Sequence, residues 1–373
     1  MKVNFTGFLT DASGYGEAAR RLVSAIATTS IELARGRVLS DGGWRLPTAD
    51  LSEPVQRVLA TPSHANPDAH VMLCAPADFP KVVTTAGEQV GMFCWETDRL
   101  PEVCRAGLAA VQRVLVPSMF VRAACNQADI QASIVPFPAV LPPPVDDDSL
   151  IRREIPAAGY TFYSIGTWQP RKNPVGLLIA YLTEFTGNDD VQLVIKTGGP
   201  DSEKVLDMAE RDTKHVLTVL NLPNPPHVKI LSGSYRSEDI WQVHHAGDAC
   251  VSLTRGEAFG LPFLDAMAAG KVVIAPEWGG QRGFLYDYPG YYPVDYTLTP
   301  VFQRYPGFDG TQLWAEPHIL SAREQMRKVA AWGGIEKIAI SHPSSRSSSI
   351  EHLGRFSAEV VGATLMECLH GRD

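Results

Sequence analysis

Long apolar runs and an excess of positive charge are both lacking in this sequence. No apolar run reaches the roughly 18–20 residues that a membrane-spanning helix requires. The formal net charge is −8, which disfavours broad attraction to nucleic acid or to an anionic membrane surface. The N-terminal stretch MKVNFTGFLTDASG carries one lysine and a short alternating pattern instead of a long apolar core. We therefore expect a cytoplasmic protein without an integral membrane segment and without general nucleic-acid binding.

Cysteine is scarce as well. There are six cysteines in 373 residues, and no two have the CxxC spacing of a zinc or redox site. Buried, reduced thiols are therefore expected. The neighbours His244 and His245 would point about 100° apart on a helix, which indicates an ordinary helix rather than a metal site. The sequence predicts neither a metal site nor a bound cofactor.

The chain does contain a regular alternation of strand-like and helix-like segments. Its 373 residues, 45% hydrophobic and 20% charged, are too many for one core and suit two folded domains. The alternation predicts an α/β architecture with mostly parallel sheets. In the first half, strands are expected near 3–9, 71–75, 89–94, 114–116 and 133–136, and helices over 15–28, 101–110 and 120–128.

A proline-rich and then acidic segment, PFPAVLPPPVDDDSLIRREIPAAG at 136–159, interrupts this pattern. Three consecutive prolines exclude helix and form a stiff extended chain. We expect an N-terminal Rossmann-like domain over 1–145, a linker over 146–158 and a C-terminal Rossmann-like domain over 159–345. A final helix within 346–373 is expected to cross back to the N-terminal domain.

The second half repeats the α/β alternation. Strands are expected over 160–165, 191–197, 228–231, 249–253 and 272–275, and helices over 174–185, 202–220, 237–246, 262–269, 319–332 and 347–369. The stretch 283–318, rich in Tyr, Pro and Gly, is expected to be an ordered excursion. Two such domains would face a central cleft, and ligands of parallel sheets bind at the carboxyl ends of the strands.

A basic pair follows the first expected strand of the second half, in SIGTWQPRKNPVGLLIAY. Asn173 suits a helix N-cap and Pro174 the first helical turn. Arg171 and Lys172 would then stand at a helix N-terminus, where the dipole disfavours cations unless an anion is bound. The pair is compatible with a phosphate site and equally with a solvated basic turn.

Two acids, Glu257 and Asp265, enclose the apolar stretch in RGEAFGLPFLDAMAAG. Gly260 would allow the backbone of Phe259, Gly260 and Leu261 to approach a ligand closely. Carboxylates suit paired sugar hydroxyls because they offer several lone-pair positions. The alternative makes Asp265 a partner of the helix dipole and Glu257 a surface acid.

Two further motifs lie in the first half. TDASGYGEAARRL contains Gly14 and Gly16, which favour either a dinucleotide-binding turn or a flexible loop facing a phosphate or substrate. Four residues separate these glycines from the preceding strand, whereas the dinucleotide fingerprint places them at the strand end. In GMFCWETDRLPEVC, Glu96 should stand at the carboxyl end of a strand, and Trp95 offers a flat face for sugar packing. Glu96 could instead cap the helix that follows.

Together these motifs resemble the GT-B-fold retaining glycosyltransferases of family 4, also called group 1. The resemblance is strongest across 160–335. Three segments carry it: IGTWQPRKNP, ILSGSYRSEDIWQVHHAGDACVSLTRGEAFGLPFLDAMAAGKVVIAP and LWAEPHILSAREQMRKV. The family's E-x7-E pattern falls on Glu257 and Asp265, with aspartate in place of the second glutamate. The stretch EWGGQRGFLYD also lacks the Gly-Gly-x-x-Glu found in relatives.

The resemblance implies a metal-independent, retaining hexosyltransferase that moves a sugar from a UDP- or GDP-sugar to an acceptor hydroxyl. Arg171 and Lys172 would neutralise the departing diphosphate. Glu257 and the backbone of Phe259, Gly260 and Leu261 would hold the sugar and phosphates. The other implied donor contacts are a ribose contact by Asp265, a base site near Ser234 and Tyr235, and the loop of Gly14 and Gly16. Glu96 would be an acceptor-side polar group.

Two other functions stay open from the sequence. A sugar-nucleotide-binding protein without turnover is suggested by Asp265 and the altered loop at 281–283. An NAD-dependent oxidoreductase is suggested by the Gly14 and Gly16 spacing. The acceptor is not identified by any motif.

Overall fold

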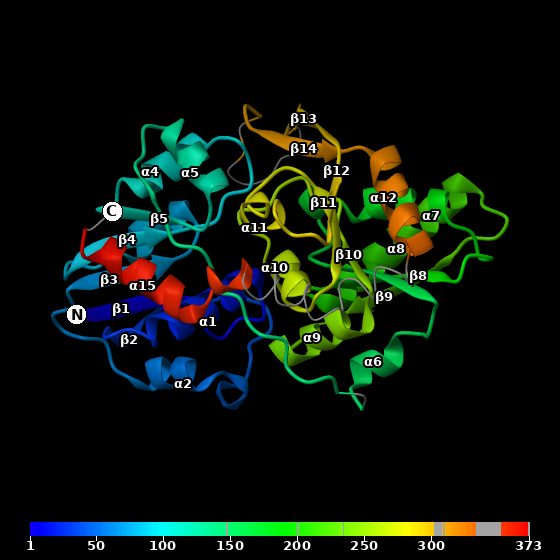
Figure 1. The fold of residues 1–373 in the computed structure, drawn as a ribbon. Coiled ribbons are helices and arrows are strands. Elements are labelled where there is room, and N and C mark those ends of the chain that lie inside the picture. Colours follow the sequence, from blue (N-terminus) through cyan, green and yellow to red (C-terminus); the bar gives the residue numbers. More distant parts are fainter. Residues whose placement is uncertain are drawn as a thin grey trace.

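The computed structural model describes residues 1–146, 148–199, 201–233, 235–301, 308, 310–332 and 352–371 (Figure 1). Two six-stranded sheets dominate the fold, with the strand orders β2-β1-β3-β4-β5-β6 and β12-β11-β10-β7-β8-β9. Neighbouring strands within each of the two sheets pair in parallel. The expected α/β class with two Rossmann-like halves is confirmed.

The first half of the chain builds the first sheet. Its strands are β1 (Lys2–Gly7), β2 (Glu32–Val38), β3 (Ala69–Leu73), β4 (Glu88–Met92), β5 (Arg113–Val116) and β6 (Ser133–Ile134). Its α-helices are α1 (Gly14–Ile26), α2 (Glu53–Ala60), α3 (Phe79–Val82), α4 (Glu102–Leu108) and α5 (Met119–Asn126). The pattern did not predict β2 because this edge strand buries only Ala34 among its seven residues.

The second half builds the other sheet. Its strands are β7 (Tyr160–Ile165), β8 (Val191–Thr197), β9 (His227–Ser232), β10 (Ala249–Val251), β11 (Val272–Pro276) and β12 (Tyr291–Val294). Its helices are α6 (Leu150–Glu154), α7 (Pro174–Glu184), α8 (Ser202–Leu220), α9 (Ser237–Ala246), α10 (Leu261–Ala268), α11 (Arg282–Leu285) and α12 (Ile319–Trp332). The expected excursion contains α11, β12 and an antiparallel pair, β13 (Tyr296–Pro300) with β14 (Leu313–Pro317).

The C-terminal helix α15 (Ala358–Leu369) lies against α1 of the first half (Figure 1). A Cβ at Gly362 would stand 2.3 Å from the Ala25 carbonyl oxygen, so the two helices cross almost backbone to backbone. The sequence pattern predicted one helix over 347–369, but α15 begins at Ala358 because the Ser357 hydroxyl caps it by accepting from the Val360 N–H. Residues 347–351 of that prediction lie outside the described residues. The domain boundaries remain a prediction.

The two halves share an aromatic cluster. The ring of Phe259 contacts Phe137 from the first half, Phe284 from the second, and Phe356 just before α15. The ring centroids lie 5.3–6.1 Å apart, the range of favourable tilted and edge-to-face packing. Apolar burial therefore holds the segment at 259 firmly between the two sheets.

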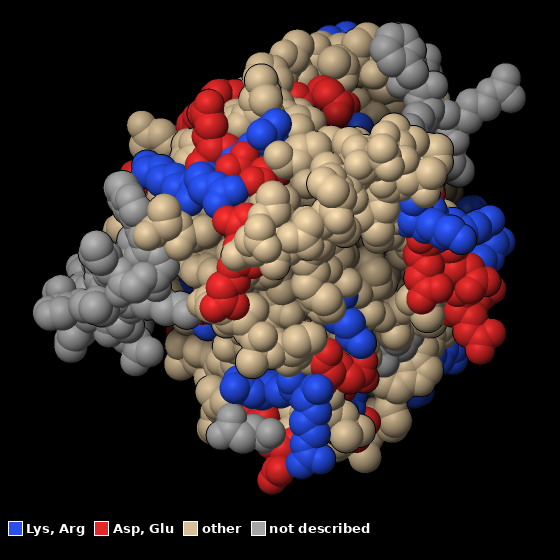
Figure 2. All heavy atoms as spheres, turned by 90° about the vertical axis from the view of Figure 1, so that its right-hand side faces the viewer, with Lys and Arg blue, Asp and Glu red and all other residues tan. Residues whose placement is uncertain are grey.

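The face of the molecule on the side of α7 and α12 carries charge of both signs in small groups. Figure 2 shows Lys and Arg lying beside Asp and Glu on this face, with no broad patch of one sign. On α7 and α12, for example, Glu184 pairs with Arg323 and Arg327. In the part of the chain that the structure describes, no helix is long and apolar enough to cross a membrane.

Candidate active site

The basic pair lies at the carboxyl end of β7, where the chain turns into α7. Arg171 and Lys172 belong to a short 3₁₀ turn over Pro170–Lys172. Asn173 follows in the left-handed conformation, with φ of 50°, and its side chain accepts a hydrogen bond from the Gly176 N–H at 3.2 Å. The predicted cap and the predicted Pro174 start are confirmed, so local chemistry alone places both cations before a helix N-terminus.

Glu257 is the carboxylate that the basic pair contacts. Its Oε1 lies 2.5 Å from Lys172 Nζ and 2.9 Å from the Thr254 hydroxyl, and its Oε2 lies 3.5 Å from Arg171 Nη1. Burial alone would raise the pKa of Glu257, but the Lys172 ammonium and the Arg171 guanidinium outweigh it and lower the pKa. Glu257 is thus held as an ionised, buried carboxylate.

The first half contributes Glu96 to the same cluster. Arg171 Nη2 lies 3.4 Å from Glu96 Oε1, while Arg171 Nη1 donates to the Gly256 carbonyl at 2.6 Å. Glu96 follows the end of β4, as the sequence predicted. The backbones also meet here, because a Cβ at Gly256 would stand 2.1 Å from the Glu96 carbonyl oxygen. Two cations and two carboxylates therefore converge where the carboxyl edges of the two sheets face each other.

Trp95 does not offer the sugar platform suggested by its position in the sequence. Its side chain is buried, its ring stacks on Phe308 with centroids 5.1 Å apart, and its indole N–H donates to the Thr97 hydroxyl and the Arg99 carbonyl. Phe308 comes from a segment 213 positions away, which is why local sequence did not reveal this packing.

The turn at Phe259, Gly260 and Leu261 leads into α10. Gly260 adopts φ of +94° and is the N-cap residue, a conformation that favours glycine. The Ser118 hydroxyl, at the N-terminus of α5, donates to the neighbouring Ala258 carbonyl at 2.6 Å. Since the Phe259 ring lies in the aromatic cluster, Phe259 can meet a ligand only through its backbone.

The loop after β11 departs from the family pattern by closing on itself. Gln281 is fully buried, and its side-chain amide donates to the carbonyls of Pro276 and Trp278 at 3.1 and 2.7 Å. Gly280 N–H donates to the Glu257 carbonyl at 2.7 Å. In this structure the loop supports the backbone of Glu257 and presents no carboxylate at 281–283.

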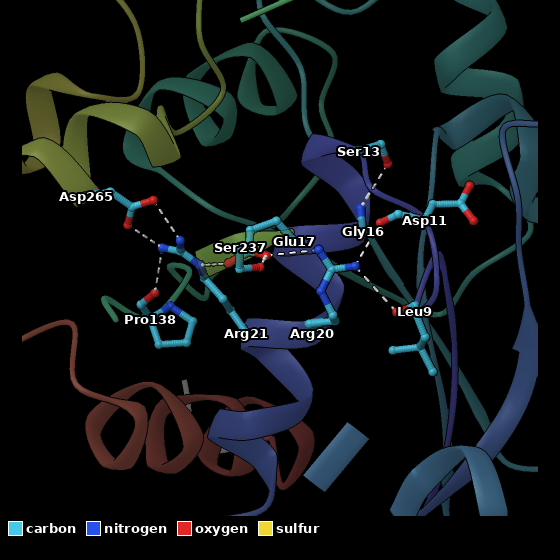
Figure 3. A network of polar contacts seen from close by, with 10 residues as sticks. All are labelled: Leu9, Asp11, Ser13, Gly16, Glu17, Arg20, Arg21, Pro138, Ser237 and Asp265. Carbon is cyan, nitrogen blue, oxygen red and sulfur yellow. Dashed lines mark hydrogen bonds and ion pairs between the residues drawn. The ribbon is translucent and has the colours of Figure 1, made fainter. Parts of the chain in front are cut away.

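Asp265 contacts an arginine from the first half of the chain (Figure 3). Arg21, on α1, donates to both carboxylate oxygens of Asp265 at 2.8 and 2.7 Å. Both side chains are less than a tenth exposed. The ribose contact implied by the family resemblance stays a prediction, and Arg21 is a partner that the sequence motifs did not indicate.

Gly14 and Gly16 lie in the first turn of α1, which the Ser13 hydroxyl caps by accepting from the Gly16 N–H at 3.1 Å. A Cβ at Gly16 would stand 2.0 Å from the Asp11 carbonyl oxygen, so this glycine permits close packing of the preceding loop. A Cβ at Gly14 would meet nothing within 4 Å. Gly14 is therefore the glycine of the two that leaves open space at the helix N-terminus.

The site expected for the nucleotide base, near Ser234 and Tyr235, contains a cation that the sequence motifs did not indicate. Ser234 lies outside the described residues. The Tyr235 ring lies under the Lys196 ammonium, 4.9 Å from Nζ to the ring centroid. Burial lowers the pKa of Lys196 to about 8. Within the described residues no carboxylate pairs with Lys196. In the sequence, Lys196 was marked only by its position near the carboxyl end of an apolar strand.

Lys196 lies at the same sheet edge as the basic pair. Its carbonyl accepts from the Gly166 N–H at 3.1 Å, and Gly166 in turn lies beside the aliphatic part of Lys172. Residues able to hold an anion thus extend from Lys172 across β7 to β8. No group of three or more His, Cys, Asp or Glu in the described ranges is arranged to hold a metal ion.

Comparisons with solved structures identify the fold. The chain superposes over its whole length on sucrose-phosphate synthase from Thermosynechococcus elongatus, with a TM-score of 0.68, 13% identity and 98% of that chain covered. A glycosyltransferase from Rickettsia africae gives a TM-score of 0.65, 13% identity and the same two coverages. With S. aureus TarM, solved with UDP and alpha-GlcNAc-glycerol, the TM-score is 0.54 at 14% identity, covering 80% of this chain and 55% of that one. The architecture is GT-B, as expected.

The sequence comparison finds one family that matches part of the chain. No curated protein sequence matches the chain. Residues 148–291 match the family described as glycosyl transferases group 1. The matching segment carries Arg171, Lys172, Glu257 and Asp265, so the resemblance of these motifs to the group 1 glycosyltransferases is confirmed for that part of the chain.

Proposed function

We propose that the protein is a retaining glycosyltransferase that moves a hexose from a nucleoside diphosphate sugar to an acceptor hydroxyl without a bound metal ion. The observation that carries the proposal is the cluster of Arg171, Lys172 and Glu257 at the carboxyl edge of the second sheet. The cluster lies within the segment that matches the group 1 family and faces Glu96 across the two halves.

The proposed chemistry follows from where charge develops. When the bond between the anomeric carbon and the diphosphate breaks, negative charge grows on the leaving phosphate oxygen. Arg171 and Lys172 would stabilise that charge in place of a metal ion. These cations are already oriented by Glu257, so little reorganisation is needed as the reaction proceeds. In a retaining reaction by front-face attack, the leaving phosphate oxygen would accept the proton of the incoming hydroxyl.

Without Lys196, the charged groups of the proposed donor site have no net positive charge with which to attract a diphosphate. Arg171 and Lys172 are balanced by Glu96 and Glu257, so these four groups together have no net charge. A diphosphate adds negative charge to this edge of the sheet. Lys196 supports the proposal because it adds a cation on β8, the strand next to β7 at the same edge, above Tyr235.

Nucleotide binding and transfer are tested in sequence. Thermal shift and calorimetry with UDP, GDP and their sugars should show saturable binding of one nucleotide class, with EDTA present throughout. Donor hydrolysis is then followed for the wild type, Arg171→Ala and Lys172→Ala, with Arg57→Ala as a control because Arg57 is an exposed cation on α2. We expect turnover in the wild type and the control and its loss in the two site variants.

Three outcomes would contradict the proposal. Saturable nucleotide binding without hydrolysis or transfer to any acceptor would favour a sugar-nucleotide-binding protein without turnover. Tight NAD binding in place of nucleoside diphosphates would favour an oxidoreductase. Inversion at the anomeric centre, measured by NMR of the first product formed, would exclude the retaining mechanism.

A further inference from the structure

Among the residues that the structure describes, the Arg21–Asp265 pair is the most completely buried ion pair between the two halves of the chain. The side chains are 4% and 8% exposed, and the two residues are 244 positions apart, on α1 and α10. Each guanidinium Nη group donates to a different carboxylate oxygen. This bidentate geometry fixes the relative position and the orientation of the two helices, which a single hydrogen bond does not.

The pair belongs to a network whose charges balance (Figure 3). Glu17, one turn before Arg21 on α1, accepts from Arg21 Nε at 2.7 Å and from Arg20 Nη2 at 2.9 Å. The Ser237 hydroxyl, in the first turn of α9, donates to Glu17 at 2.9 Å. Two arginines and two carboxylates thus compensate each other without a ligand, and the carboxylates of Asp265 and Glu17 outweigh burial and raise the pKa of Arg21.

The network contacts α9 and α10, the two helices that begin beside the proposed donor site. Ser237 comes two residues after Tyr235, and Asp265 comes one turn after Leu261. Aspartate is short, so its carboxylate stays close to α10, and the longer arginine spans the gap from α1. Movement of α1 relative to α10 would therefore break both hydrogen bonds and displace the backbone turn at Phe259, Gly260 and Leu261.

We propose that Arg21 is a positioning residue which, by binding Asp265, holds α10 and its N-terminal turn against α1. The carboxylate of Asp265 serves this contact between the two halves and does not bind the ribose of the donor. The inference rests on the proposed function for its nucleotide readout, and it replaces the ribose role that the family resemblance implied for Asp265.

The test combines variants of the pair with changes in the nucleotide. Arg21→Gln, Asp265→Asn and the double variant are compared with the wild type in the full-length protein. Dissociation constants are measured for the preferred nucleoside diphosphate and for its 2′-deoxy and 3′-deoxy analogues. Glu53→Gln is the matched control, because Glu53 pairs with Arg57 on the exposed face of α2.

A positioning role predicts that Arg21→Gln and Asp265→Asn weaken nucleotide binding by a similar factor. The preference for the intact ribose over each deoxy analogue should stay within about twofold of the wild-type ratio, since no ribose contact is lost. Each single variant should lower the melting temperature, because it leaves a buried charge without its partner. The double variant leaves no unpaired charge, so its melting temperature should fall by less than the sum of the two single decreases.

A ribose contact by Asp265 predicts a different result. Asp265→Asn would then erase the preference for the intact ribose, and Arg21→Gln would keep it; this pattern overturns the inference. Should the Gln and Asn variants not fold, Arg21→Lys keeps the charge but removes the bidentate geometry and is measured in the same way. If the wild type binds no nucleoside diphosphate, the proposed function fails. The positioning contact is then tested by melting temperature alone, and it is overturned if the decrease in the double variant equals the sum of the decreases in the two single variants.

Discussion

Lys172 Nζ and Glu257 Oε1 lie 2.5 Å apart, although they come from loops that follow different strands of the second sheet. The contact joins the turn after β7 to the turn after β10, and β7 and β10 are adjacent in that sheet. The cation proposed to meet the diphosphate and the carboxylate proposed to meet the sugar are thus oriented by each other.

Replacing Glu257 by glutamine should reduce turnover by about a hundredfold or more, the scale seen when one preorganised polar group is removed from an active site. The amide keeps the shape but leaves Lys172 and Arg171 without their buried counter-charge. Steady-state donor hydrolysis measures the effect. Glu316→Gln is the control, because Glu316, on β14, pairs with Arg255 at the edge of the site. A glutamine variant as active as the wild type would exclude the proposed role of Glu257.

Lys196 should make nucleotide binding depend on pH. Its pKa of about 8 means that the ammonium form is complete at pH 6.5 and mostly lost by pH 9. The association constant for a nucleoside diphosphate should therefore fall as the pH rises through 8. Calorimetry from pH 6.5 to 9.5 checks this, and Lys196→Met should bind more weakly at pH 6.5 and lose the fall near pH 8. The same fall in Lys196→Met and in the wild type would assign it to another group.

Glu17 should contribute to acid sensitivity. Burial alone would raise its pKa, but the guanidinium groups of Arg21 and Arg20 outweigh burial and lower the pKa from 4.5 to about 2. The folded state therefore gains stability from the ionised form above pH 4.5 and loses it as the pH falls from 4.5 to 2. The loss should be about 3 kcal/mol in the free energy of unfolding, since one pKa unit corresponds to ~1.4 kcal/mol. Urea unfolding at several pH values measures it.

The Glu17→Gln variant is the comparison for that measurement. Its stability should be lower at pH 7 and should decline less steeply between pH 4.5 and 2, because the titrating group is gone. Parallel pH profiles for the two proteins would contradict the assignment. Glu53→Gln, on exposed α2, should follow the wild-type profile.

Gly260→Ala should destabilise the turn that opens α10. The φ of +94° is unfavourable for alanine, and the added Cβ would stand 2.9 Å from the Phe263 ring. A loss of about 1–3 kcal/mol is expected from such backbone strain. Gly283→Ala is the control, because its φ is not positive and its Cβ would meet nothing within 4 Å. Equal melting temperatures for the two variants would contradict the strain.

Local chemistry accounts for what the sequence predicted well. The Asn173 cap, the Pro174 start and the Gly260 turn each depend on neighbours within a few positions, and all three are present. The second sheet followed from apolar strands separated by clear helices. By contrast, α2 was not predicted, because it spans only eight residues and buries only Val55 and Val58.

Contacts between distant segments account for what the sequence did not predict. Trp95 is covered by Phe308, Asp265 is bound by Arg21, and each pair is more than 200 positions apart in the chain. Lys196 has an ordinary place at the end of a strand, and its altered pKa arises only when Tyr235 and the neighbouring loops cover it. These properties depend on tertiary packing, which no local motif encodes.

The close approach of Gly256 to the Glu96 carbonyl limits which substitutions the contact between the two halves can accept. At this point the two halves touch through main-chain atoms, and a Cβ at 256 would stand 2.1 Å from the oxygen. This closest approach is made by main-chain atoms and so does not depend on which side chains surround the site. Position 256 is the exception, because every other amino acid would act as a wedge between the halves, and a designed Gly256→Val protein would provide the separated form for study.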